Sequence, residues 1–152
     1  MRDYTKIGAW QRADDLTVAL YEETRTFPRE ERYGLTSQLR RAASSVAANI
    51  VEGSARESKK EYLHFLYIAR GSLAEAQYFI HLAKRLNYLD ETRAENLAGQ
   101  TRQTFAALHG LITAVEKEAG YFRKMSALFT SLLALSLARV SFGPAVLGLV
   151  VR

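Results

Sequence analysis

Apolar and polar residues follow a helical rhythm along most of the chain. Apolar side chains recur at spacings of three and four, which places them on one face of a helix, and no stretch shows the strict alternation of a strand. The pattern therefore predicts four helices of roughly 20 to 30 residues each. The four series are Trp10, Ala13, Leu16 or Thr17, Leu20 and Thr24; Leu35, Leu39, Ala42, Val46 and Ile50; Tyr62, Leu66, Ala69, Leu73, Ala76, Ile80 and Ala83; and Leu97, Thr101, Thr104, Leu108, Leu111 and Val115.

Short breaks separate these series. They fall between Phe27 and Gly34, between Gly53 and Ser58, between Asn87 and Asp90, and at Gly120. Short connections favour antiparallel neighbours, and the 3-4 rhythm of the third and fourth series is close to a heptad, which favours shallow packing angles. The sequence therefore predicts an all-α, up-down-up-down four-helix bundle over residues 1–120.

Two of the predicted helices begin with recognisable capping residues. Ser58 and Glu61 have the spacing of a capping box, in which side chains satisfy free backbone donors. Asp90 is a suitable N-cap for the fourth helix, and Glu91 would lie favourably near the positive end of its dipole.

The third and fourth helices carry further apolar residues beside their main series. Wide apolar stripes occur on ordinary core helices, but broad apolar surface on a small domain usually marks association. We favour subunit contact in a homo-oligomer, and a wide core stripe is the alternative. The residues concerned are Phe65, Ile68, Phe79, Leu82, Phe105 and Ile112.

Composition fits one folded domain. The chain has 152 residues, of which 48% are hydrophobic and 24% charged, a balance that excludes a disordered protein. Cysteine is absent, so disulfides, thiol nucleophiles and thiolate metal sites are excluded. The first eleven residues lack the apolar core of a secretory signal, and we therefore expect a cytoplasmic location.

No arrangement of residues predicts an enzyme, a metal site or a cofactor. His64, His81 and His109 are not three or four residues apart, the spacing that aims two helical ligands at one point. Glycine-rich phosphate loops and a nucleophile elbow are absent, and carboxylates occur singly. Structural or surface histidines explain the pattern better than ligands.

Residues 37–71 combine several basic residues with few acidic ones. We expect Arg40, Arg56, Lys59 and Lys60 to be exposed around the turn between the second and third helices. There they can contact phosphates, although a solvated basic turn explains them equally well.

A second set of polar residues from the same helices is interpreted as structural. Arg41 lies beside the apolar stripe, where a buried charge would need partners. We therefore expect a paired polar layer composed of Arg41, Asn49, Glu52, Arg70 and Glu75.

Several runs of sequence carry a family resemblance. They are YGLTSQLRRAASSVAANIVEG from Tyr33, RESKKEY from Arg56, FLYIARGSLAEAQY from Phe65 and LNYLD from Leu86. Together they strongly resemble the bacterial four-helix-bundle family named for 23S rRNA intervening sequences, to which the accessory protein of diversity-generating retroelements looks related. The match runs from about Tyr4 to Gly120.

The resemblance implies a compact antiparallel bundle that assembles into a homopentamer. It also implies nucleic-acid binding through a basic surface, as proposed for some relatives, and no established enzymatic activity or catalytic residues. The arginine that follows Glu-Gly in the family falls on Arg56. Ser45-Val46-Ala47 replaces the commoner Ser-Ile-Pro, so a proline kink in the second helix is not expected.

Residues 121–152 differ from the rest and lie beyond the resemblance. From Met125 to Ala138 there are 14 residues without a charge, which is short of the length that spans a bilayer. Three interpretations stay open for this apolar extension: a fifth helix packed on the oligomer, a weak membrane contact with basic flanks, or a poorly ordered extension outside the family.

The distribution of charge limits the functional hypothesis. The net charge is +5, but residues 121–152 contribute four basic residues and no acid, which leaves 17 basic and 16 acidic residues in the body. Any anionic partner of the body must therefore be bound through local placement of charge. The leading hypothesis is a homo-oligomeric bundle that binds RNA, DNA or a nucleic-acid-handling partner. The alternatives are an adaptor for another protein and a bundle attached peripherally to a membrane by its tail.

Overall fold

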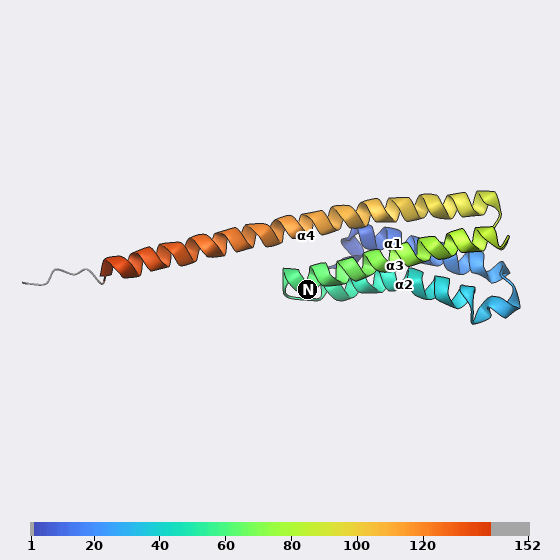
Figure 1. The fold of residues 1–152 in the computed structure, drawn as a ribbon, viewed down its shortest axis with the longest axis horizontal. Coiled ribbons are helices and arrows are strands. Elements are labelled where there is room, and N and C mark those ends of the chain that lie inside the picture. The colour runs from blue at the N-terminus through green and yellow to red at the C-terminus, as the bar shows by residue number, and fades with distance from the viewer. Residues whose placement is uncertain (1, 141–152) are drawn as a thin grey trace, which may run out of the picture. The chain divides into compact units, whose positions relative to one another are not determined.

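The computed structural model describes the backbone of residues 2–140 and the side chains of residues 2–120. Four α-helices and three short 3-10 helices make up this part of the chain (Figure 1). In chain order they are η1 (Tyr4–Lys6), α1 (Gly8–Glu23), η2 (Thr24–Thr26), η3 (Arg29–Arg32), α2 (Leu35–Ser54), α3 (Lys59–Arg85) and α4 (Glu91–Val140).

The predicted all-α antiparallel bundle is confirmed. Successive helices run in opposite directions (Figure 1), and no strand occurs in the described chain. All four predicted apolar series face one common core, in which Leu20, Leu39, Leu73 and Leu108 are fully buried. Removing these faces from water is the main stabilising contribution to such a fold.

Ser58 and Asp90 cap their helices as predicted, whereas the Glu61 carboxylate binds the Ser58 hydroxyl and not a backbone donor. The Ser58 hydroxyl accepts a hydrogen bond from the backbone N–H of Glu61 (3.1 Å) and donates one to its carboxylate (2.7 Å). Asp90 Oδ1 accepts from the N–H of Arg93 at 2.8 Å. Between these caps, Asn87 adopts a left-handed backbone with φ of 58°, a conformation that asparagine tolerates better than most residues.

The helix break predicted at Gly120 is wrong. Helix α4 continues through Gly120 to Val140, so the backbone of residues 121–140 extends the fourth helix and does not begin a fifth. A single glycine costs a helix only about 1 kcal/mol, and the leucine- and alanine-rich sequence that follows favours helix. The chain divides into two compact units, Met1–Lys117 and Glu118–Arg152, and each is described by itself.

The predicted roles of the apolar extension lie outside the described side chains. Within the part of the chain that the structure describes, no helix is both long enough and apolar enough to cross a bilayer. Packing of residues 121–152 on an oligomer, or their contact with a membrane surface, stays a prediction.

The second apolar stripe is divided between the core and the surface. Ile112 is buried, and Phe79, Leu82 and Phe105 are half-buried against the core. The side chain of Ile68, by contrast, is 40% exposed. Much of this stripe therefore widens the core, and the subunit contact predicted from it stays a prediction.

Helices α2 and α3 approach each other closely at Gly53. A Cβ atom at this position would lie 2.8 Å from Cδ2 of Tyr62 and 2.9 Å from Cβ of Phe65. Both contacts are shorter than carbon atoms tolerate, and both belong to the first turns of α3. The absence of a side chain at Gly53 therefore sets how closely α3 can turn back against α2.

We predict that Gly53→Ala destabilises the bundle. A methyl group here overpacks the contact, which costs about 1–3 kcal/mol, while the better helix propensity of alanine returns about 1 kcal/mol. The control is Gly110→Ala, because the added Cβ at exposed Gly110 meets nothing within 4 Å. Chemical denaturation should show Gly53→Ala to be less stable than Gly110→Ala; equal stability would mean that the close contact is unimportant.

Candidate nucleic-acid interface

The predicted basic turn lies between Ser54, where α2 ends, and Lys59, where α3 begins. Arg56 and Lys60 are exposed, and Lys59 is half-buried. The Arg56 guanidinium donates to Oε1 of Glu52 and lies 4.8 Å above the centre of the Phe65 ring. The turn therefore presents cations, and the charge of Arg56 among them is paired with a carboxylate.

The structure adds Arg2 to this turn. Its backbone N–H donates to the carbonyl of Ser54 (3.4 Å), its side chain reaches the carbonyl of Arg56 (3.5 Å), and its guanidinium lies 4.7 Å from the centre of the Tyr62 ring. A hollow of about 310 Å³ is lined by Arg2, Ser54, Ala55, Arg56 and Glu57. Sequence reasoning missed Arg2 because no local pattern connects residues 54 positions apart.

Arg40 does not lie at this turn. It is fourteen residues before the end of α2, and at 1.5 Å per residue this corresponds to about 21 Å along the helix. Its Nε donates to Oγ1 of Thr24 (2.8 Å) and its terminal nitrogen to the carbonyl of Tyr21 (3.3 Å). The expectation that Arg40 is exposed beside Arg56, Lys59 and Lys60 is therefore wrong, because helical rise separates them and Arg40 is half-buried against the end of α1.

Arg40 instead lines a second hollow, which we call the arginine–tyrosine groove. It is about 480 Å³ in volume and lies between the end of α1, η3 and the start of α2. No carboxylate belongs to its lining among the described residues. The lining residues are Tyr21, Arg32, Tyr33, Thr36, Ser37, Arg40 and Arg41.

Each tyrosine of the groove lies against an arginine. The Arg40 guanidinium is 4.7 Å from the centre of the Tyr21 ring, and that of Arg32 is 5.7 Å from the centre of the Tyr33 ring. Tyr33 is nevertheless 84% exposed, which is high for a large ring. Sequence reasoning did not select Tyr21, Arg32 or Tyr33; the adjacent Arg-Tyr pair before Gly34 is the signal that could have indicated them.

The five residues of the predicted polar layer do not form one layer. Arg41 does pair with Glu75 at 2.8 Å, but the two side chains are 62% and 38% exposed. Glu52 pairs with Arg56, and the guanidinium of Arg70 lies 4.9 Å from the ring centre of Tyr67. Arg41 and Glu52 are eleven residues apart on α2, about 16 Å along its axis, so one layer cannot include both.

A second polar contact between α2 and α3 is uncharged. The hydroxyls of Ser45 and Ser72 are hydrogen-bonded at 2.9 Å, and Asn49 donates to the Ser45 hydroxyl and carbonyl at 3.0 and 2.7 Å. Of the five predicted residues, Asn49 therefore belongs to this interhelical contact. Hydroxyl pairs fit between closely packed helices without the desolvation cost of buried charges.

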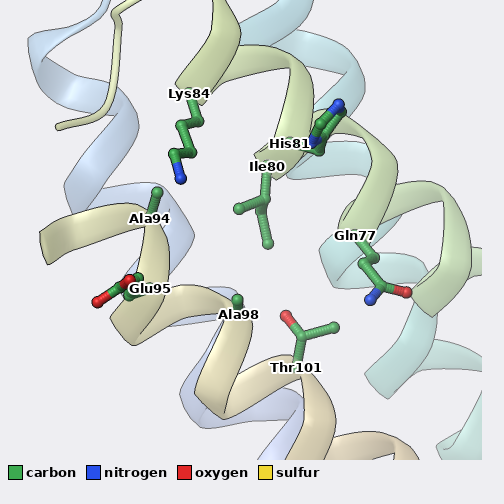
Figure 2. A pocket seen from close by; sticks show the side chains of 8 residues that line it. All are labelled: Gln77, Ile80, His81, Lys84, Ala94, Glu95, Ala98 and Thr101. Atoms are coloured by element: carbon green, nitrogen blue, oxygen red, sulfur yellow. The ribbon is translucent and has the colours of Figure 1, made fainter. Parts of the chain in front are cut away.

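A third hollow, of about 250 Å³, lies between α3 and α4 (Figure 2). Ile80, Ala94 and Ala98 contribute apolar surface to it, and Lys84 on its margin donates to Glu91 at 2.5 Å. Figure 2 shows His81 and Glu95 on opposite sides of the hollow. They are therefore not arranged as an acid and base acting on one bound group.

The shifted pKa values reflect hydrogen bonds that hold the fold together. The hydroxyl of Tyr67 donates to Glu116, which raises the pKa of Tyr67. Burial and the nearby Glu31 carboxylate raise the pKa of Tyr88. Both phenols therefore remain protonated donors at neutral pH. Within the described part of the chain, no group of three histidine, aspartate or glutamate residues is placed to hold a metal ion.

The fold and these surfaces define a helical-bundle protein with basic surface sites. The chain belongs to the 23S rRNA-intervening sequence protein family, whose family model matches residues 5–110. This confirms the resemblance stated above.

A solved structure shows the same fold. It is the crystal structure of a protein with unknown function from the S23 ribosomal protein family of Bacteroides thetaiotaomicron VPI-5482, with a TM-score of 0.62 and 20% sequence identity. The similarity covers 68% of the present chain and 97% of the other. At this identity it bears on the fold alone. No curated protein matches the chain.

We predict that the Arg41–Glu75 pair contributes little to stability. Exposed ion pairs typically contribute about 0.2–1 kcal/mol, whereas breaking a buried pair costs about 3–5 kcal/mol. A double-mutant cycle of Arg41→Ala and Glu75→Ala, measured by chemical denaturation, should therefore give a coupling below about 1 kcal/mol that weakens with added salt. A coupling of several kcal/mol, insensitive to salt, would instead support the buried layer.

Proposed function

We propose that this protein is a non-enzymatic, cytoplasmic bundle that binds nucleic acid. The observation that carries the proposal is the arginine–tyrosine groove, which is lined by three arginines and, among the described residues, by no carboxylate; of the three, Arg41 is paired with Glu75, and Arg32 and Arg40 are not within salt-bridge distance of an acid. Elsewhere on the body acidic and basic residues nearly balance. A local excess of positive charge is what binding to a phosphate backbone requires.

The basic turn provides a second, weaker contact surface. Arg2, Arg56, Lys59 and Lys60 gather there, but Glu52, Glu57 and Glu61 lie on or beside the same turn. The exposed Lys60 can hold a phosphate as a point charge, and arginines can hold phosphates as forks. We therefore assign the groove the larger part of the binding and the turn a supporting part.

Binding should be electrostatic and should depend on these cations. With duplex DNA or structured RNA, the logarithm of affinity should fall linearly with the logarithm of salt concentration. Arg32→Gln should weaken binding and lower the slope by about 0.9 for duplex DNA, and the double variant Arg56→Gln, Lys60→Gln should have a smaller effect. Fluorescence anisotropy over a salt series measures both quantities.

The matched control is Arg102→Gln. Arg102 is an exposed arginine of α4 that lies outside both surfaces, so this variant should bind like the parent. Absence of binding at low salt would contradict the proposal and favour the adaptor alternative. So would equal losses in all three variants, because these would indicate a general charge effect.

We further propose that the bundle is a homopentamer. Support comes from the family resemblance and from large apolar side chains exposed on α3, namely Tyr67, Ile68 and Tyr78. Association would remove these side chains from water. Symmetry would also repeat each basic surface, which compensates for the near-zero charge of one body.

Mass measurement in solution tests the assembly. Sedimentation equilibrium at micromolar concentration should give five times the mass of the 17.1 kDa chain. A monomer under these conditions would contradict the pentamer but would leave the binding proposal to be decided by the salt series.

A further inference from the structure

The rings of the arginine–tyrosine groove are placed as a stacking surface. Tyr33 follows η3 and precedes α2, and it exposes most of its ring although Arg32 lies beside it. Tyr21 lies near the end of α1 and is 43% exposed, with Arg40 against its ring. Exposed aromatic rings beside guanidinium groups can accept a planar base, since every base has a π-face.

The backbone around Tyr33 is held in place before any ligand binds. The N–H of Gly34 donates to the carbonyl of Glu31 at 3.0 Å, and the N–H of Leu35 donates to the Glu31 carboxylate at 2.8 Å. The same carboxylate accepts the hydroxyl of Tyr88 at 3.3 Å. The backbone on both sides of Tyr33 is therefore fixed. A ligand that stacks on this ring would cost little conformational entropy in the backbone.

These hydrogen bonds also hold the Glu31 carboxylate in place near the groove. Glu31 is committed to the start of α2 and to Tyr88, and Arg41 is paired with Glu75. Among the described residues, neither Arg32 nor Arg40 has a carboxylate within salt-bridge distance. Two uncompensated guanidinium groups therefore lie next to the two rings.

The groove is large enough for a small ligand. A volume of about 480 Å³ lies within the range of small-molecule sites, roughly 300–1,000 Å³. The groove also lies at the first turn of α2, where Ser37 is exposed and the positive end of the helix dipole favours a phosphate. In a duplex the faces of the bases are covered by their neighbours, and only a single strand can offer one to Tyr33.

We propose that the arginine–tyrosine groove binds single-stranded nucleic acid, with a base stacked on Tyr33 or Tyr21 and the adjoining phosphate held by Arg32 and Arg40. This inference rests on the proposed function and adds the form of nucleic acid that is recognised. Stacking supplies selectivity for unpaired strands, and the guanidinium groups supply the charge-dependent part of the affinity.

The test compares a fluorescently labelled single-stranded oligothymidylate with a duplex of the same length. Tyr33→Ala should weaken single-strand binding roughly 5- to 100-fold, because one stacked base is lost, and should leave the salt slope and duplex binding unchanged. Tyr33→Phe, which keeps the ring, should bind like the parent. Arg32→Gln should lower the single-strand salt slope by about 0.7.

Matched controls come from exposed residues outside the groove. Val18→Ala shortens an apolar side chain of α1 that is 53% exposed, and Arg85→Gln removes an exposed arginine of α3. Neither should alter single-strand binding. Thermal unfolding by circular dichroism should show that Tyr33→Ala remains as stable as the parent, since Tyr33 is almost fully exposed.

The outcomes separate this inference from the function on which it rests. If the parent binds neither probe at low salt, both proposals fail. If it binds both probes and Tyr33→Ala changes neither affinity, nucleic-acid binding stands and the stacking groove is overturned. Equal binding of polyglutamate, with the same sensitivity to Tyr33→Ala, would identify an acidic protein segment as the ligand and would also overturn the inference.

Discussion

The contact of α2 with α3 at Gly53 is the constraint on which the basic turn depends. Since a Cβ at this position would lie within 3 Å of both Tyr62 and Phe65, only a residue without a side chain permits the observed turn. The same two rings then support the guanidinium groups of Arg2 and Arg56. Packing in the core therefore determines where the cations of the turn lie on the surface.

Because the body is nearly neutral, the positions of its carboxylates decide which parts of its surface are positive. With 17 basic and 16 acidic residues before residue 121, positive surface arises only where carboxylates are held elsewhere. At the turn they are not, because Glu52 binds Arg56 directly. At the groove Glu31 is held by the start of α2 and by Tyr88, and Glu75 pairs with Arg41 alone. Arg32 and Arg40 therefore carry the available positive charge of the groove.

Sequence periodicity was sufficient to predict the helices and their core, because a buried helix face leaves a regular pattern at spacings of three and four. The caps at Ser58 and Asp90 depend on residues close together in the sequence and could also be predicted from it.

The candidate site could be predicted less well from the sequence. The charge pattern groups Arg40 with the turn, but the rise of α2 separates Arg40 from it. Arg2 and Tyr21 reach their positions through tertiary contacts that no local pattern records. Gly120 does not end the fourth helix, because one glycine is not sufficient to break it.

The loop between α1 and α2 connects stability with charge through Glu31. Its carboxylate satisfies the first backbone donor of α2, a role that the N-cap residue Gly34 cannot fill because it has no side chain. It also accepts the hydroxyl of Tyr88, from the turn that leads into α4. A neutral residue at this position would remove a charge near the groove but would leave the start of α2 less well held. The bundle therefore retains an acid beside the arginine–tyrosine groove for structural reasons, and the hydrogen bonds of Glu31 go to the start of α2 and to Tyr88, not to the arginines.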